Sequence, residues 1–275
     1  MAEKKIDELL ISDADFKRMV SYVQSNYGID LHAKRQLIQS RLTATVKNKG
    51  FQDFKGYVDY LLTKGTGDDI NELLGKLTTN YTYFQRETES FDYFVKKILP
   101  DITQKHAKNK TLSIWSAACS SGEEPYNVTM YMMDYFGKQW SAWDARMLAT
   151  DLSLDVLAKA KRGIYQLPDN MPAHWKREYF KAPAGGGNRY EISPKVKSNV
   201  IFRQFNLMDP IQFKRKFDVI FCRNVMIYFD MPTKTALINR LYDATVPGGY
   251  LIISLSENLP PDTRWKRINS AIFQK

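Results

Sequence analysis

From about residue 111 onward, short apolar runs alternate with amphipathic stretches, and this alternation restricts the fold more than any other feature. Strand-like runs occur at TLSIWSAA, RMLATD, NVIFRQFNL, KFDVIFCRNV and YLIISLS. Helix-like stretches lie between them, at EEPYNVTMYMMDYFG, SLDVLAKAKRG and MPTKTALINRLYDATV. Strands that alternate with helices predict an α/β fold built on a doubly wound, mostly parallel sheet.

Three details of this region can be stated as expectations. The Pro-Gly-Gly string at 247–249 predicts a sharp turn before YLIISLS, and INSAIFQK predicts a last edge strand. Residues of about 175–200 break the alternation, with strand-like FKA and RYEIS on either side of the glycines 185–187. We expect a small β insertion there, and a surface loop without strands is the alternative.

Residues 1–78 contain helical patterns only. Ser12 is a plausible N-cap with Asp15 three positions later, and Gly28 suits the end of that helix. A second helix is expected before Gly50, and DFKGYVDYLLTKG and DDINELLGKLTTN predict two more. We therefore divide the chain into an all-α domain at 1–78 and an α/β domain at 79–275.

Composition limits the partners and the compartment. The formal net charge of +10 favours anionic partners, but residues 1–78 are nearly neutral, so no basic N-terminal arm is expected. The two cysteines form no CxxC pair, which argues against a zinc site. No apolar run is long enough to span a membrane, and the charged start MAEKKIDELL lacks a signal core. A cytoplasmic protein without a metal is the expectation.

In an open parallel sheet the ligand binds beyond the carboxyl ends of the strands. The first such loop, AACSSGEEP, contains one glycine and is no GxGxxG motif, although its small residues permit close approach to the backbone. Glu123 and Glu124 would repel a phosphate and suit a cation such as S-adenosylmethionine. Two glutamates that merely complement a helix dipole are the equally weighted alternative.

Two further loops carry candidate ligand contacts. Asp151 ends the second predicted strand, where an acid commonly accepts hydrogen bonds from ribose hydroxyls, although capping the next helix is also a common role. Asn206 and Leu207 follow the third strand and are candidates for holding the edge and face of an adenine. Each of these residues, taken alone, is also ordinary loop chemistry.

Five strings in order are more specific than any single residue. They are TTNYTYFQRE (78–87), IWSAACSSGEEPY (114–126), ATDLSLDVLAKAKRGIY (149–165), FDVIFCRNVMIYFD (217–230) and PGGYLIISLSEN (247–258). Together they resemble the chemotaxis receptor methyltransferases, the CheR family. The resemblance implies a class I methyltransferase-like fold. It also implies methyl transfer from S-adenosylmethionine to glutamate side chains of chemoreceptors, which forms glutamyl methyl esters and S-adenosylhomocysteine.

The resemblance also assigns residues to roles. It places Arg86 and Tyr228 nearest the transferred methyl and the incoming carboxylate, as candidate catalytic residues. The implied cofactor contacts are Asn80, Thr82, Arg86, Glu124, Asp151, Asn206, Leu207, Arg223 and Asn224. TYFQRE departs from the family's TxFFRE at Gln85, which puts either local packing or a substrate contact in question.

A basic helix suggests a protein partner. Lys34, Arg35, Arg41 and Lys47 follow one another there, and a solvated face is the plain interpretation. The resemblance implies instead that they face the methyl-accepting helices of the chemoreceptor cytoplasmic domain. In some family members the β insertion docks the receptor's C-terminal tail peptide, and the sequence leaves open whether this one does.

The chemistry agrees with a glutamate acceptor, which is already ionised at neutral pH and needs no general base. We therefore expect packing or surface roles for the three histidines (His32, His106 and His174) and the two cysteines (Cys119 and Cys222). One alternative is a nucleic-acid methyltransferase, but residues 223–226 read Arg-Asn-Val-Met where many amino-methylating enzymes have Asn/Asp-Pro-Pro-aromatic. The other is a catalytically silent cofactor-binding adaptor. We expect neither nucleic-acid binding nor membrane insertion.

Overall fold

Side-chain caps mark the start of three of the four helices in residues 9–78. α1 (Asp13–Tyr27) starts at Ser12, whose hydroxyl accepts a hydrogen bond from the Asp15 N–H. α2 (Arg35–Asn48) and α3 (Phe54–Lys64) follow, and α4 (Gly67–Leu77) starts with a capping box. The four helices predicted for the N-terminal region are thus confirmed.

The computed structural model describes residues 9–78, 80–183 and 186–275, which form two compact units. The helical unit comprises Met1–Asn80 and Tyr228–Asp230, and the α/β unit comprises Tyr81–Ile227 and Met231–Lys275. Apolar side chains from all four helices make the core of the helical unit: Val20, Val23, Ile38, Leu42, Val46, Phe54, Val58, Leu61, Leu73 and Leu74. Phe229 belongs to this unit through an antiparallel bridge to Ile29.

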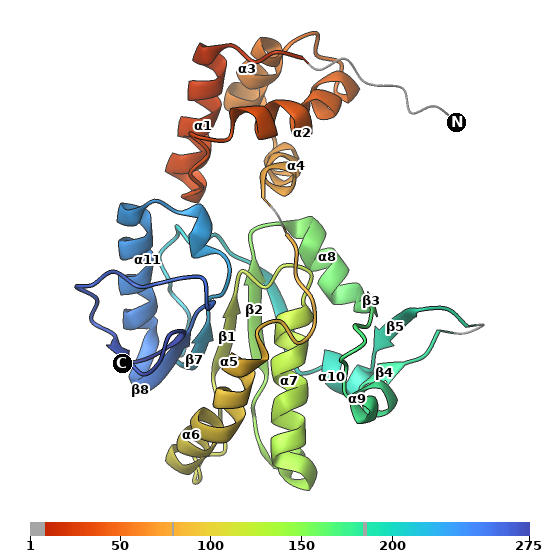
Figure 1. Cartoon of the computed structure of the whole chain (residues 1–275), viewed down its shortest axis with the longest axis vertical. Helices are drawn as coiled ribbons and strands as arrows, with labels where there is room; N and C mark the ends of the chain where they lie inside the picture. Colours follow the sequence, from red (N-terminus) through yellow and green to blue (C-terminus); the bar gives the residue numbers. More distant parts are fainter. Residues whose placement is uncertain (1–8, 79, 184–185) are drawn as a thin grey trace. The chain divides into compact units, whose positions relative to one another are not determined.

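A twisted sheet forms the centre of the α/β unit (Figure 1). In the described residues its order is β6 (Val200–Gln204), β2 (Met147–Asp151), β1 (Ile114–Ala117), β7 (Phe217–Phe221), β8 (Thr245–Ile252), β10 (Ile272–Gln274) and β9 (Lys266–Arg267). The first five strands run parallel, and the last two are antiparallel to their neighbours. The predicted doubly wound, mostly parallel sheet is confirmed.

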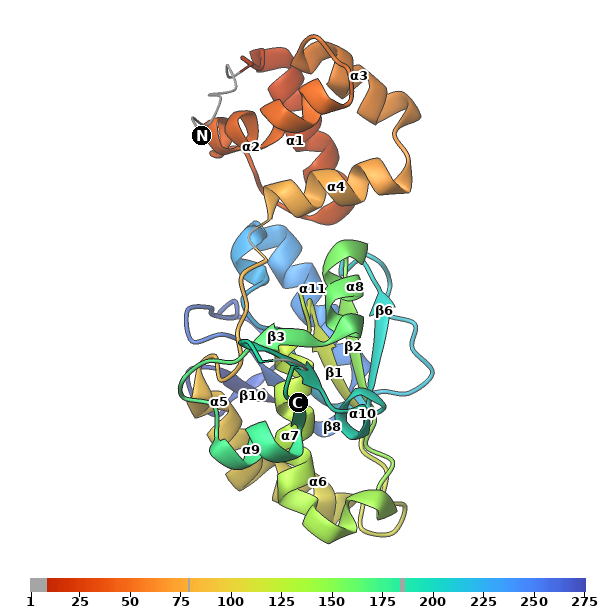
Figure 2. The ribbon, with the colours of Figure 1, turned by 90° about the vertical axis from the view of Figure 1, so that its right-hand side faces the viewer.

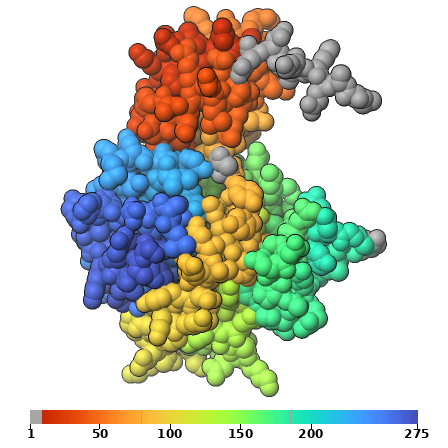
Figure 3. Space-filling view, viewed as in Figure 1, coloured from red at the N-terminus to blue at the C-terminus, as the bar shows by residue number. Residues whose placement is uncertain are grey.

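The central strands β1 and β7 are buried on both faces, as continuous apolar strands require. Ile114 packs with the helices before and after β1, which are α5 (Thr88–Tyr93), a π-helix (Phe94–Ile98), α6 (Leu99–Lys105) and α7 (Glu123–Phe136). Trp115 points to the opposite face, where its ring meets Phe213 and Phe217 at centroid distances of 5.3 and 5.2 Å. In Figure 3 the amber surface of the α5 region lies between the blue C-terminal residues and the green region of α7 and α9.

A second, small sheet confirms the predicted β insertion. Its order is β3 (Ile164–Gln166), β5 (Arg189–Ile192) and β4 (Phe180–Lys181), all antiparallel. It lies beside α7 and α8 (Leu154–Arg162), with α9 (Ala173–Glu178) and α10 (Pro194–Lys197) next to it (Figure 2). The insertion begins earlier than predicted, because β3 supplies a third strand. Gly185, at the predicted hairpin tip, lies outside the described residues.

Three predictions about the secondary-structure elements were incomplete or wrong. No element was predicted over residues 88–105, which are helical. The glycines at 248 and 249 lie inside β8 and form an irregularity in its pairing with β7, so the turn predicted after α11 (Met231–Ala244) is wrong. The final strand β10 is no edge strand, because β9 pairs with its outer side. The described part of the chain also contains the short 3-10 helices η2 (Gly137–Ala142) and η3 (Met226–Tyr228).

Gly122 ends the first loop in a left-handed conformation at φ 94°. A Cβ atom there would lie 2.7 Å from Cβ of Ala160 in α8, so α8 packs against bare backbone. We predict that Gly122→Ala lowers the free energy of unfolding by about 1–2 kcal/mol of left-handed strain and by a further ~1–3 kcal/mol of overpacking.

Denaturation followed by tryptophan fluorescence measures this loss, because all five tryptophans lie in the α/β unit. Gly248→Ala is the matched control. Gly248 also has a left-handed φ, of 72°, but an added Cβ would meet only the flexible end of Lys105. Alanine at 248 therefore introduces left-handed strain without overpacking. Equal losses in the two variants would contradict the packing argument.

Candidate functional site at the carboxyl edge of the sheet

The strand order reverses between β1 and β7, which is where an open α/β sheet leaves a crevice for ligands. The loop 118–122 follows β1, and Ser153 starts α8 just after β2. The turn 222–224 follows β7, and Ser254 lies just after β8. The sequence-predicted loops therefore leave neighbouring strands at the same edge of one sheet.

The backbone at this edge is strained. Among the described residues other than glycine, six have a positive φ, and five of these lie in the segments that meet here: Gln85, Glu87, Ala118, Ser120 and Asn224. Each such conformation costs on the order of 1–3 kcal/mol and persists only when the surroundings enforce it. Strain concentrated in one place is typical of functional sites.

Asp151 ties the first loop to the second strand. Its carboxylate accepts hydrogen bonds from the backbone N–H of Ser120 at 2.8 Å and of Ser153 at 2.9 Å. Burial raises the pKa of Asp151, and these two hydrogen bonds oppose that shift. Both roles foreseen for the residue are compatible with this position, since it anchors the start of α8 and lies at the sheet edge. Its contact with a ribose stays a prediction.

The two glutamates of the first loop are less available than the sequence suggests. Glu124 accepts hydrogen bonds from Ser116 Oγ at 2.7 Å and from Arg223 Nη1 at 3.0 Å. Burial raises the pKa of Glu123, whose carboxylate accepts a hydrogen bond from Ser121 Oγ. The expectation that two uncompensated carboxylates select a cation is therefore weakened, because the charge of Glu124 is matched inside the protein.

Arg223 is the centre of this edge. Its side chain is only 2% exposed and lies between Glu124 and Glu87, with Nη2 3.2 Å from a Glu87 carboxylate oxygen. Nη2 also donates to the backbone carbonyl of Arg86 at 2.7 Å, and the guanidinium lies 4.9 Å from the ring centroid of Phe91. The chain before β1 and the turns after β1 and β7 are thus joined through one side chain.

Sequence reasoning missed two acidic residues of this edge, Glu87 and Glu257. Glu257 is 3% exposed and accepts hydrogen bonds from the backbone N–H groups of Ser254, Asn224 and Met226 at 2.9–3.0 Å. Burial raises its pKa although these donors act in the opposite direction. The available signal was the acid in the Ser-Glu-Asn string directly after the last parallel strand.

The remaining predicted residues lie in both units. Arg86 is 26% exposed, and its Nη1 donates to the carbonyl of Tyr81 at 2.9 Å. Asn206 Oδ1 accepts from the Met208 N–H at 3.0 Å, and the Leu207 carbonyl accepts from Arg240 at 2.6 Å. Thr82 is half-buried in the α/β unit, whereas Asn80 and Tyr228 are part of the helical unit. Their roles stay predictions.

Gln85 has a packing role. It is 7% exposed, its N–H donates to Asn127 Oδ1 at 3.0 Å, and its Oε1 accepts from the Tyr131 hydroxyl at 2.7 Å. The departure from the family pattern therefore changes a buried polar contact with α7 rather than an exposed surface.

The histidines and cysteines occupy structural positions, as expected. Each histidine ring lies 2.7–2.9 Å from an aspartate oxygen, in the pairs His32–Asp30, His106–Asp218 and His174–Asp134. Burial raises the pKa of both the Cys119 and the Cys222 thiols, so they remain protonated packing groups. Within the described ranges no group of side chains is arranged to hold a metal ion, and no helix has the length and apolarity needed to cross a membrane.

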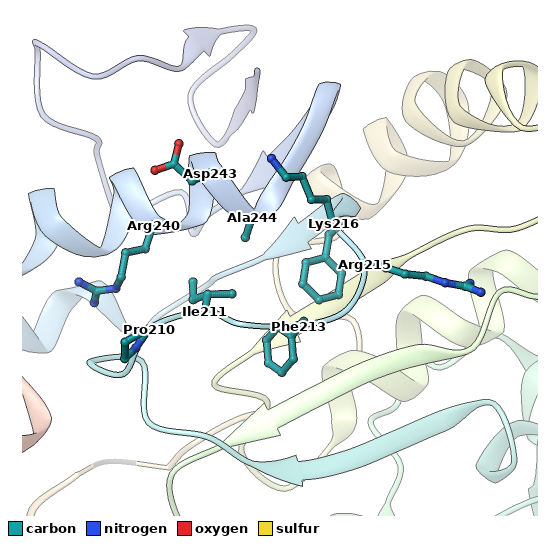
Figure 4. A pocket seen from close by; sticks show the side chains of 9 residues that line it. Pro210, Ile211, Phe213, Arg215, Lys216, Arg240, Asp243 and Ala244 are labelled. Atoms are coloured by element: carbon teal, nitrogen blue, oxygen red, sulfur yellow. The ribbon is translucent and has the colours of Figure 1, made fainter.

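A hollow of about 260 Å³ lies between the loop before β7 and the end of α11 (Figure 4). None of the predicted site residues lines it. Phe213 and Ile211 form its apolar wall, whereas the cationic ends of Arg215, Lys216 and Arg240 point in different directions in Figure 4. We assign no ligand to it.

Parts of the basic helix α2 are already used inside the helical unit. Arg35 bonds the carboxylate of Asp13 and the carbonyl of Ile11. Arg41 Nη1 donates to the carbonyl of Lys76 at 3.0 Å and so satisfies the end of α4. Lys34 and Lys47 are exposed. Binding of a partner by these four residues stays a prediction.

Replacing Arg223 would leave two partly buried carboxylates, Glu87 and Glu124, without their shared cation. We predict that Arg223→Gln costs about 3–5 kcal/mol of unfolding free energy at neutral pH, the usual cost of breaking a buried pair. Arg223 helps to lower the pKa of Glu87 below its ordinary value of 4.5. Because the pKa of Glu87 is lower in the folded protein, its ionised form stabilises the fold at pH values above about 4.5. This stabilisation is lost as the pH falls through the lowered pKa.

The deficit of Arg223→Gln should therefore shrink as the pH falls below about 4.5, where protonation of Glu87 removes the unbalanced charge. Urea denaturation of both proteins across this range measures it. Arg215→Gln, at a 68% exposed side chain, serves as the control and should change little. A deficit independent of pH would show that charge balance is not the cause.

Comparison with known proteins assigns the chain to a family. The all-alpha domain of CheR methyltransferase matches residues 14–78, and the CheR methyltransferase SAM binding domain matches residues 80–272. A chemotaxis protein methyltransferase of Borreliella burgdorferi is 38% identical over 96% of this chain and 95% of its own length. Chemotaxis protein methyltransferase 2 of Vibrio cholerae is 32% identical over 92% and 88%.

Solved structures resemble the chain more remotely. An S-adenosylmethionine dependent methyltransferase from Mesorhizobium loti is 14% identical, with a TM-score of 0.32 over 57% of this chain and 53% of its own. The family assignment rests instead on the two matched domains and on the extent of the sequence identity. The chain belongs to the CheR methyltransferase family, with S-adenosylmethionine as its methyl donor.

Proposed function

We propose that this protein transfers a methyl group to glutamate side chains of chemoreceptors and so forms glutamyl methyl esters. The observation that carries the proposal is the family match over both domains, together with relatives named chemotaxis protein methyltransferase. The receptor as the acceptor and the ester as the product are inferred from that membership and from the chemistry of the edge.

The residues at the sheet edge fit S-adenosylmethionine. Asp151 ends β2 and Asn206 follows the neighbouring strand β6, so a carboxylate and an amide lie at the edge where the hydroxyls and the base of an adenosine would bind. The small residues after β1 let a ligand reach the backbone. When bound, the cofactor supplies an electrophilic methyl on a sulfonium.

A glutamate acceptor explains why the site needs no base. Each histidine is paired with an aspartate, none of these aspartates belongs to the turns after β1, β2, β7 or β8, and both cysteines are buried thiols. A glutamate carboxylate is already ionised at neutral pH and can attack directly. The protein must therefore align the two reactants and exclude water, and alignment alone can contribute about 7–11 kcal/mol.

Arg86 is the residue we propose to hold the incoming carboxylate. Its guanidinium is partly exposed, and its backbone is fixed by the hydrogen bond from Arg223. A guanidinium presents a planar fork of donors that matches a carboxylate. Tyr228 is proposed, from the resemblance alone, to donate a hydrogen bond to the reacting groups.

The proposal predicts a base-labile label. Incubation with radiolabelled S-adenosylmethionine and a receptor cytoplasmic fragment should label the fragment, and mild base should release the label as methanol. Arg86→Ala should lower turnover about 100-fold, the usual scale for a misplaced reactant. Arg215→Ala, an exposed arginine, is the control. Base-stable label, or label in added RNA or DNA instead, would refute glutamate methylation.

The basic helix predicts a salt-dependent association with an acidic receptor. Lys34→Glu should reduce kcat/KM about 2- to 10-fold at low salt, and the difference should vanish as salt screens the charges. Lys34 suits this test better than Arg41, because Arg41 also donates a hydrogen bond to the Lys76 carbonyl at the end of α4 and its replacement would disturb the helical unit. Lys64→Glu, an exposed residue at the end of α3, is the control. A changed kcat with an unchanged salt dependence would contradict a docking role.

A further inference from the structure

Glu87 joins three segments at the carboxyl edge. Its Oε1 accepts hydrogen bonds from Ser254 Oγ at 2.9 Å and from Asn224 Nδ2 at 3.4 Å. Its Oε2 accepts from the Leu255 N–H at 3.0 Å and from Arg223 Nη2 at 3.2 Å. One carboxylate thus links the chain at 87 with the turn after β7 and the turn after β8.

This carboxylate is charged at neutral pH. Burial acts to raise the pKa of Glu87, but the Leu255 N–H, the Arg223 guanidinium and the Ser254 hydroxyl together lower it below the ordinary value. An ionised carboxylate has only acceptors, which is what four converging donors require. Protonation or amidation would set a donor against at least one of them.

Contacts of Arg223 and of Glu87 fix the backbone on the carboxyl side of Arg86. The Arg86 carbonyl accepts from Arg223 Nη2 at 2.7 Å, and the next residue, Glu87, is held at φ 56°. Glutamate seldom adopts this left-handed conformation unless its surroundings enforce it. The four hydrogen bonds to the Glu87 side chain enforce this conformation. They thereby fix the backbone position from which the Arg86 side chain extends.

We propose that Glu87 is a positioning residue for methyl transfer: it holds Arg86 against the turns after β7 and β8 and so sets the place of the incoming carboxylate. This inference rests on the proposed function. Glu87 acts through Arg86, and its effect on the reaction must therefore depend on the Arg86 guanidinium.

A double-mutant cycle tests this dependence. In the full-length protein, Glu87→Gln should lower kcat for methylation of a receptor fragment about 10- to 100-fold, because a displacement near 1 Å can have that effect. Calorimetric titration with S-adenosylhomocysteine should still show one site per chain, which gives the fraction of folded protein. Glu89→Gln, an exposed glutamate two residues away, is the matched control and should leave kcat unchanged.

In an Arg86→Ala background, the further effect of Glu87→Gln on kcat should fall below about 2-fold, since residues that act as a unit are not additive. A full Glu87→Gln effect in that background would overturn the inference, because the residue would then act independently of Arg86. An unchanged kcat in the single variant would overturn it as well.

Ser254→Ala removes one donor to Glu87 and is the milder variant if Glu87→Gln does not fold. It should lower kcat about 3- to 10-fold in wild type and have little effect when Arg86 is absent, by the same coupling argument. A wild-type protein that transfers no methyl to the receptor fragment would refute the proposed function itself. Normal wild-type transfer with additive variants would refute the positioning role alone.

Discussion

A guanidinium buried between two carboxylates organises the carboxyl edge of the sheet. Arg223 reaches Glu124, 99 residues away in sequence, and Glu87, 136 residues away. Replacing such a buried ionic cluster with hydrophobic residues can leave a protein equally stable, so the ion pairs alone do not show that this cluster stabilises the fold. The planar guanidinium holds its N–H donors in a fixed geometry, so each of its hydrogen bonds orients the segment that it contacts.

Carboxylates also satisfy backbone groups that the sheet leaves unpaired. Backbone N–H groups just beyond the end of a strand need partners when they are buried. Asp151 accepts from the N–H groups of Ser120 and Ser153, and Glu257 accepts from those of Ser254, Asn224 and Met226. Burial raises the pKa of both residues, so their ionised forms depend on these donors. The acidic residues of this edge thus shape the loops before any ligand binds.

Local signals in the sequence were enough for most of the fold. Ser12 capped its helix as predicted, and the five apolar runs became β1, β2, β6, β7 and β8. Local patterns failed where strand pairing decides the secondary structure. The glycines at 248 and 249 resemble a turn but lie in β8, which pairs with β7. The strand β9 has two residues and was too short to recognise. The predicted loops leave neighbouring strands at one edge of the sheet. The Arg223 contacts could not be predicted from the sequence, because they join residues that are far apart in it.

The left-handed residues at this edge limit which sequences the site tolerates. Ala118, Ser120 and Asn224 adopt a conformation that glycine enters freely, that asparagine and aspartate enter at low cost, and that branched side chains resist. Random drift at these positions is therefore restricted to a short set of amino acids. Glycine would relieve the strain but would also let the loops sample other shapes, so a glycine variant would exchange backbone strain for a less firmly held edge.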